Sequence, residues 1–390
     1  MLAGDVSGDV HAAALGRALL ARDPQLSLHA LGGRRLREVV AESPDGEFLA
    51  DTSNRSAIGL LSVMGIYMKC RKLRDRLWEF VDTHPVDIAV LCDWGAFNGR
   101  VLRGFHARGI QTLYYFPPRS WERSGSLGLG IVPYVTRVAT PFPWSAERLR
   151  AAGARAEWVG HATLENIPPP NKRLLLRERL GVAPNETLIA LLPGSRPSEI
   201  GVLAPRMAKA AAMISQQIGA RFIAVVPAEL LEQARRRLPQ SIDIVTDCAK
   251  ELLVASDAAI VKTGTGTLEA AVANTPQVAV YDVSIPARLE WLFLWAWRWV
   301  PFIAMPNIIL QRRAVPEFWG LSCRPNIIAR AVIRLLTDQP AREKVLRDYQ
   351  EIRHALGADL PLPPTERTAE IVEEMLRQKA GRLEPQQLTV

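Results

Sequence analysis

The stretch LIALLPGSRPSEIGVL, residues 188–203, joins an apolar run to an amphipathic run through a Pro-Gly turn. A short apolar run that ends in such a turn is typical of a buried parallel strand followed by a helix. Gly194 allows the tight turn, the first amides of the helix can hold an anion, and Arg196 adds a forked donor for phosphate oxygens. Ser195 is expected to cap the helix, and Glu199 either completes a capping-box-like arrangement or contacts a sugar hydroxyl.

The segment KTGTGTLE, residues 262–269, has a similar design and follows the apolar run Ala258–Val261. Its backbone amides and hydroxyls suit a diphosphate, and they belong to Gly264, Thr265, Gly266 and Thr267. Glu269, in the first helical turn, could accept hydrogen bonds from ribose hydroxyls. The residue order matches neither GxxxxGK[ST] nor GxGxxG. The alternative is an ordinary capped helix for the first segment and a plain glycine-rich turn for the second, but two such loops in one half favour anion binding.

Around these loops, short β-rich runs alternate with longer helical runs, which indicates α/β architecture with parallel sheets. The predicted strands are Leu28–Leu31, Asp87–Cys92, Thr112–Phe116, Arg137–Ala139, Arg155–Val159, Thr187–Leu192, Arg221–Val226, Ile242–Thr246, Ala258–Val261 and Gln277–Tyr281. The predicted helices are His11–Arg22, Leu60–Thr83, Asn98–Arg108, Trp144–Ala152, Gly201–Gln217 and Glu229–Arg237. Between the halves, the proline run Ile167–Asn171 reads as a stiff linker. We therefore expect two doubly wound domains facing a cleft, with ligands at the carboxyl ends of the strands. The last ~20 residues are polar and are expected to fray.

Composition narrows the choice of partners. The chain has 390 residues, 48% of them hydrophobic and 23% charged, which excludes a mainly disordered or collagenous protein. Its formal net charge of +8 favours anionic partners. The four cysteines form no CxxC pair, which argues against a zinc site or a disulfide framework and fits a reducing compartment. Dispersed arginines without a nucleic-acid-binding motif argue against nucleic acid as a partner. Acidic residues near the start interrupt any early apolar run, so no signal peptide is expected.

Two motifs in the first half carry titratable groups. The segment AGDVSGDVH, residues 3–11, follows what reads as the end of a buried strand, so either the start is assigned late or the first strand is unusually short. Its glycines, among them Gly8, allow close backbone approach to a ligand, and Ser7 and Asp9 can cap the next helix. Asp5, Asp9 and His11 could act on a hydroxyl proton. The segment CDWGAFN, residues 92–98, places Asp93 at a strand end. Turn formation and capping are the alternatives for both.

These motifs together resemble the lipid-A-disaccharide synthases. The segment AGDVSGDVHAA is similar to their AGExSGDxHGA opening, and CDWGAFN is similar to their IDAPDFN segment. Further blocks follow in the same order, from Gly4 to about Glu317: Val159-Gly160-His161, LLPGSR with Glu199, TGTGTLEA, and Met305-Pro306-Asn307.

The resemblance implies a GT-B fold and an inverting glycosyltransferase that needs neither a metal nor a cofactor. It would transfer 2,3-diacylglucosamine from UDP to 2,3-diacylglucosamine 1-phosphate, forming a β-1,6 bond and releasing UDP. Residues 1–166 would bind the acceptor, residues 171–350 the UDP-sugar, and residues 351–390 would form a helical tail. UDP would be held through Gly194, Ser195, Arg196, Thr265, Gly266 and Glu269. The further substrate-binding residues would be Ser7, Gly8, Asp9, Asn98, Trp121, His161, Glu199, Gly264, Thr267 and Asn307.

Three positions depart from the family pattern. Ala96 stands where the second Asp of IDAPDFN would be, and alanine cannot take a proton. The family's SPSVWAWR segment is altered around Trp121, and Asp5 replaces a longer Glu. Asp93 is therefore the first candidate for the general base, followed by Asp5 or His11. The alternatives are a UDP-sugar 2-epimerase, a transferase with another acceptor, or a non-catalytic paralogue that binds a nucleotide-sugar or a lipid.

The run Leu289–Met305 is apolar but shorter than the ~20 residues that span a bilayer, and charge and proline interrupt it. Trp291, Trp295 and Trp299 share a helical face, with Trp297 nearby and with Arg288, Arg298, Arg312 and Arg313 to meet anionic headgroups. We interpret this as an interfacial patch, and we expect a cytoplasmic protein peripherally associated with the inner membrane. A buried aromatic cluster or a dimer contact is the alternative.

Overall fold

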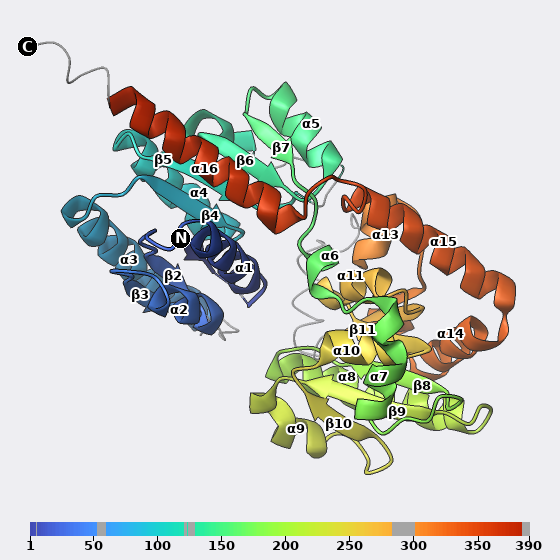
Figure 1. Ribbon diagram of the computed structural model, residues 1–390. Helices are drawn as coiled ribbons and strands as arrows, with labels where there is room; N and C mark the ends of the chain where they lie inside the picture. Colours follow the sequence, from blue (N-terminus) through green and yellow to red (C-terminus); the bar gives the residue numbers. More distant parts are fainter. Residues whose placement is uncertain (5, 53–59, 121–122, 124–128, 283–300, 384–390) are drawn as a thin grey trace, which may run out of the picture. The chain divides into compact units, whose positions relative to one another are not determined.

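The computed structural model describes residues 1–4, 6–52, 60–120, 123, 129–282 and 301–383. The chain divides into two units (Figure 1): Met1–Ala162 with Leu356–Val390, and Thr163–Ala355. The expected boundaries near residues 166 and 350 therefore lie a few residues from the observed ones. The expected helical tail, residues 351–390, is divided between the units: its first residues end a helix of the second unit, and the remainder belongs to the first.

The first unit is built on a seven-stranded parallel sheet in the order β3-β2-β1-β4-β5-β6-β7. Its strands are β1 Leu2–Ala3, β2 Ala30–Gly32, β3 Phe48–Asp51, β4 Ile88–Cys92, β5 Gln111–Tyr115, β6 Arg137–Thr140 and β7 Ala156–Trp158. Its helices are α1 Val6–Arg22, α2 Arg34–Ala41, α3 Leu60–Thr83, α4 Gly95–Ala107, α5 Pro143–Ala151 and α16 Pro364–Leu383. The strand order reverses between β1 and β4, which is where ligands bind in open sheets of this kind.

Side chains alternate across this sheet into two cores. Tyr115 and its same-face neighbours pack with α1, α2 and α16, whereas Tyr114 faces the core formed with α3 and α4. The helix α16 therefore returns the end of the chain to the first unit (Figure 1). Its Ile371 and Met375 are buried, and Arg22 of α1 pairs with Glu366 at 2.8 Å. The prediction that the last ~20 residues fray is therefore wrong as far as Leu383, because this helix has a buried apolar face.

The second unit has a six-stranded parallel sheet in the order β10-β9-β8-β11-β12-β13. Its strands are β8 Leu188–Leu192, β9 Arg221–Val226, β10 Asp243–Thr246, β11 Ala258–Lys262, β12 Gln277–Tyr281 and β13 Glu317–Trp319. Its helices are α6 Thr163–Asn166, α7 Arg173–Arg179, α8 Pro197–Ser215, α9 Leu231–Arg235, α10 Ala249–Ala255, α11 Thr265–Val272, α13 Met305–Leu310, α14 Pro325–Thr337 and α15 Gln339–Ala355. Between α6 and α7, the expected proline linker contains a short 3-10 turn, Pro170–Lys172. Here too the order reverses, between β8 and β11, so these two strands lie side by side.

All ten predicted strands and all six predicted helices are confirmed. Arg221–Val226, Gln277–Tyr281 and Leu60–Thr83 have the predicted ends, and the others are shifted at one or both ends. The shift matters for α1, which begins at Val6, so Ser7, Gly8 and Asp9 lie in a helix rather than in a loop before one. The strands β3 and β13 were not predicted, because each is short and only partly buried.

Candidate functional site

The carboxyl ends of β8 and β11 bring the two glycine loops together. The strands pair in register, with Val261 opposite Leu192. Gly194 has φ +119° and Gly264 has φ +141°, backbone conformations that favour glycine. Each loop opens a helix, α8 or α11, and within the described residues neither helix has a side-chain cap on its first amides. This arrangement exposes two sets of backbone donors, which suits a diphosphate.

Glu199 fixes the first loop. Its Oε2 accepts a hydrogen bond from the Ser195 backbone N–H at 3.0 Å, and its Oε1 lies 2.8 Å from Lys262 Nζ. A Cβ at Gly194 would stand 2.4 Å from Glu199 Oε2. The capping-box-like role is therefore the one that the geometry supports. The N-cap itself is Arg196 rather than Ser195, and both of these residues are exposed.

Two predicted substrate-binding residues form the framework of this edge. Thr267 is fully buried and donates its hydroxyl to the Gly264 carbonyl at 2.7 Å. Asn307 is also fully buried, and its Oδ1 accepts the backbone N–H groups of Ala314 and Val315 at 2.8 and 2.9 Å. Both side chains are committed to the backbone, so we assign them to support of the site rather than to ligand contact.

The other residues predicted to bind UDP in the second unit are at least partly accessible. Thr265 is exposed and Gly266 is half-buried at the start of α11, and the Arg196 side chain is 75% exposed. Glu269 lies one turn further on, where burial raises the pKa of its carboxyl group, partly offset by Lys250. Among the described residues its carboxylate has no hydrogen bond or ion pair, which leaves both oxygens as acceptors.

In the first unit, the corresponding edge is formed by strained turns. Asp93 and Trp94, directly after β4, have φ +51° and +47°, and Phe116, after β5, has φ +56°. Such conformations are costly for non-glycine residues and cluster at functional sites. A Cβ at Gly4 would lie 2.1 Å from the Trp94 ring, so the end of β1 must be glycine for this turn to pack as it does.

The Asp93 backbone is held by two side chains. Its carbonyl accepts a hydrogen bond from Tyr114 Oη at 2.8 Å and from Asn98 Nδ2 at 3.0 Å. Burial, reinforced by the nearby Asp93 charge, raises the pKa of Tyr114 and keeps its hydroxyl protonated. Asn98 is fully buried, so this predicted substrate-binding residue lies beneath the turn. Ala96 is exposed in the first turn of α4.

Asp9 has a structural role that the sequence did not reveal. Its carboxylate accepts the backbone N–H groups of Gly33, Arg35 and Leu36 at 2.7, 3.0 and 3.1 Å. It therefore caps α2 rather than α1. Beside it in α1, Ser7 is half-buried and Gly8 is buried.

Two histidines lie in an aromatic cluster at this edge. His11 stacks on Phe116 at 4.4 Å between ring centroids, and His161 meets His11 edge-on at 5.8 Å. Phe142 lies 5.7 Å from His161. Burial, with a contribution from His11, lowers the pKa of His161 well below its ordinary value, so His161 is neutral at physiological pH. Both histidines are about 6% exposed, so their rings are buried within this aromatic cluster.

Some predicted residues lie outside the described residues: Asp5, Trp121, the tryptophans Trp291, Trp295, Trp297 and Trp299, and Arg288 and Arg298. Arg312 is described, and it pairs with Asp348 at 2.9 Å and Glu351 at 2.5 Å, so its charge is already matched. No helix in the described part of the chain is long and apolar enough to cross a bilayer. Over the same residues, no group of three or more His, Cys, Asp or Glu side chains could hold a metal ion.

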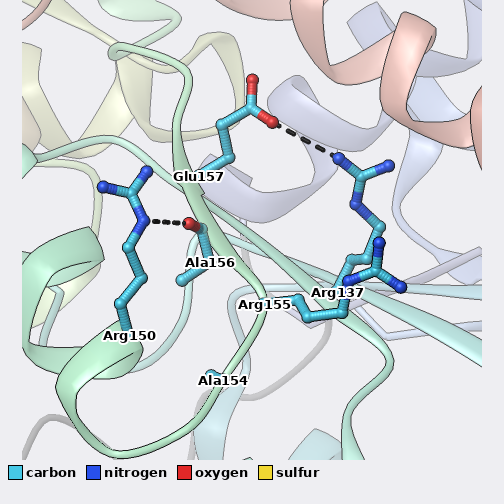
Figure 2. A pocket seen from close by; sticks show the side chains of 6 residues that line it. All are labelled: Arg137, Arg150, Ala154, Arg155, Ala156 and Glu157. Carbon is cyan, nitrogen blue, oxygen red and sulfur yellow. Dashed lines mark hydrogen bonds and ion pairs between the residues drawn. The ribbon is translucent and has the colours of Figure 1, made fainter.

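A shallow pocket of about 270 Å³ lies at the amino ends of β6 and β7, away from the candidate site (Figure 2). Arg137 pairs there with Glu157 at 3.3 Å, and Arg150 Nε donates to the Ala156 carbonyl at 2.6 Å. Glu157 also pairs with Arg367 of α16. The pocket therefore lies beside the ionic contacts that attach α16 to the sheet.

Solved structures place this architecture among the GT-B proteins. The glycotransferase of kitacinnamycin superposes with a TM-score of 0.61 at 12% identity, covering 96% of this chain and 97% of that one. A putative UDP-N-acetylglucosamine 2-epimerase from Listeria monocytogenes gives 0.61 at 13% identity, covering 97% and 96%. Arabidopsis thaliana UGT89C1 complexed with UDP gives 0.60 at 15% identity, covering 96% and 99%. The protein therefore has the GT-B fold of two doubly wound α/β domains.

Sequence comparison gives the family. The lipid-A-disaccharide synthetase family profile matches residues 1–360. The lipid-A-disaccharide synthase of Myxococcus xanthus is 32% identical over 386 residues, covering 96% of this chain and 97% of that protein. That of Prochlorococcus marinus is 34% identical over 373 residues, covering 91% and 93%. The chain belongs to the lipid-A-disaccharide synthetase family, a family of glycosyltransferases of lipid A biosynthesis, which bears out the resemblance of its motifs.

Proposed function

We propose that this protein transfers 2,3-diacylglucosamine from UDP to 2,3-diacylglucosamine 1-phosphate, forming a β-1,6 disaccharide and releasing UDP. The single observation that carries the proposal is the pairing of two glycine loops on the neighbouring strands β8 and β11. The loops present two helix N-termini to one place, where a diphosphate would gain several backbone hydrogen bonds. Arg196 adds a guanidinium, and the free carboxylate of Glu269 suits ribose hydroxyls.

The reaction is a displacement at the anomeric carbon. The acceptor 6-hydroxyl oxygen forms the new bond to this carbon, the bond to the diphosphate oxygen breaks, and the hydroxyl proton passes to a base. The loop amides and Arg196 stabilise the charge on the departing diphosphate. The UDP-sugar is the donor substrate, and no separate cofactor has a place in this scheme.

Asp93 is the base in this proposal. Its backbone is held in a strained turn by Tyr114 and Asn98, which fits a side chain that must be aimed. Asp9 is committed to α2, and Ala96 has no group that takes a proton. Asp5 and His11 remain the second choices.

The test is incubation with UDP-2,3-diacylglucosamine and 2,3-diacylglucosamine 1-phosphate, followed by mass analysis of the lipid product and assay of UDP. A disaccharide 1-phosphate formed in equal amount to UDP supports the proposal. Ala96 favours one alternative, a paralogue that binds nucleotide-sugars without turnover. Tight UDP binding with no product from any acylated acceptor would establish that alternative. A 2-epimerase would convert the UDP-sugar without releasing stoichiometric UDP.

We also propose peripheral association with an anionic membrane, on the cytoplasmic face of the inner membrane. The net charge of +8 and the four tryptophans between residues 291 and 299 support this, because acylated substrates reside in bilayers. The test is flotation with liposomes that contain or lack anionic lipid. Recovery in the unbound fraction with both lipid mixtures would contradict the proposal.

A further inference from the structure

Lys262 stands between the two glycine loops, and no role follows for it from the motifs. It is the last residue of β11, and its neighbour Val261 is in register with Leu192 at the end of β8. Its ammonium lies 2.8 Å from Glu199 Oε1 and 3.6 Å from the position that a Cβ on Gly264 would take. The Lys262 ammonium therefore lies beside the Glu199 carboxylate, which supports the first loop, and beside the Gly264 turn of the second loop.

Lys262 has N–H donors that its ion pair with Glu199 does not use. An ammonium has three N–H donors, and among the described residues the one ion pair of Lys262 is with Glu199. The only other interaction described for it is with the Tyr281 ring, whose centroid is 5.9 Å from Nζ. The Lys262 side chain is 22% exposed and the Glu199 side chain 11%, so the pair is shielded from solvent without being sealed. Arg196 is a weaker counter-charge for Glu199, since it lies 4.0 Å away and is 75% exposed.

We propose that Lys262 binds the diphosphate of the donor directly, with one N–H holding Glu199 and another donating to a phosphate oxygen. The inference rests on the proposed function, in which these loops hold UDP. A bare Glu199 carboxylate beside the diphosphate would repel it, whereas a lysine shared between them attracts both. The amides, Lys262 and Arg196 would then share the charge of the leaving group.

The test is a double-mutant cycle on UDP affinity, measured by titration calorimetry on the full chain. Lys262→Met should raise the Kd for UDP about 10- to 100-fold, the range for loss of a charge-assisted hydrogen bond. Glu199→Gln keeps an acceptor for the Ser195 N–H and should change the Kd less. Lys262→Met should still raise the Kd at least about tenfold in the Glu199→Gln background, because the phosphate contact is lost there as well.

The control is Lys344→Met. It removes another lysine from a shielded carboxylate of the same unit, with Nζ 2.9 Å from Asp348 Oδ2, and should leave UDP affinity unchanged. Thermal midpoints of all variants check folding, and Lys262→Gln replaces the methionine variant if that one unfolds. If the Lys262 substitution has no effect in the Glu199→Gln background, Lys262 is only a counter-charge and the inference fails. If the wild type itself does not bind UDP, the proposed function fails instead.

Discussion

The two carboxyl edges are built differently. After β8 and β11 in the second unit, glycines with positive φ turn the chain, and buried Thr267 and Asn307 hold the surrounding backbone. After β4 and β5 in the first unit, the non-glycine residues Asp93, Trp94 and Phe116 adopt positive φ, and the Tyr114 and Asn98 side chains hold the Asp93 carbonyl. Backbone amides recognise a phosphate whatever the neighbouring side chains are, whereas a base must be one particular side chain.

The largest effect should come from Asp93→Asn. If Asp93 takes the proton of the acceptor hydroxyl, kcat should fall by about 10²- to 10⁴-fold, the usual contribution of a general base. The Kd for UDP should stay unchanged, because the donor loops are in the other unit. The measurements are UDP release with saturating substrates and UDP titration. Full turnover in this variant would exclude Asp93 as the base and leave Asp5 and His11 as the candidates.

A weaker but still large effect is expected from Gly194→Ala. The new methyl group would meet Glu199 Oε2 at 2.4 Å, in a backbone conformation with φ +119° that alanine rarely adopts. Displacing Glu199 also breaks its bond to the Ser195 amide, so UDP affinity should fall roughly 10- to 100-fold. Gly219→Ala is the control, since a Cβ there meets no atom within 4 Å. Equal UDP affinity in both variants would refute the view that the first loop is shaped by its glycine.

Tyr114→Phe distinguishes an effect on the orientation of Asp93, the proposed base, from an effect on UDP binding. The variant loses one hydroxyl, which donates to the Asp93 carbonyl at 2.8 Å. We expect kcat to fall about fivefold with little change in KM or UDP affinity, because one buried hydrogen bond typically contributes about 1 kcal/mol. Tyr115→Phe is the matched control: the same substitution on the same strand, in the opposite core. A general loss of stability would lower activity in both variants, whereas misorientation of Asp93 would lower it only in Tyr114→Phe.

Sequence patterns predicted most of the strands and both glycine loops, for physical reasons. Apolar runs predicted ten of the strands, because parallel strands are buried on both faces. Glycine turns after β8 and β11 predicted the donor loops, because glycine permits conformations that other residues avoid. The pairing of Lys262 with Glu199 could not be predicted, since it depends on β11 lying beside β8. The capping of α2 by Asp9 depends likewise on tertiary packing, and no local rule indicates the positive φ of Asp93 or Phe116.

The smallest effect concerns pH and stability at the edge of the first unit. Burial lowers the pKa of His161 from an ordinary value of 6.5, so the unfolded chain takes up a proton there before the folded one does. The free energy of unfolding should therefore fall as the pH drops below about 6.5, by at most about 1.4 kcal/mol per pH unit from this group. His161→Asn should weaken this dependence. Urea unfolding at pH 7.5 and 5.5 measures the difference. An equal fall in the free energy of unfolding in the wild type and in His161→Asn would mean that His161 takes up its proton without unfolding. The neutral imidazole beside His11 and Phe116 would then have to be abandoned.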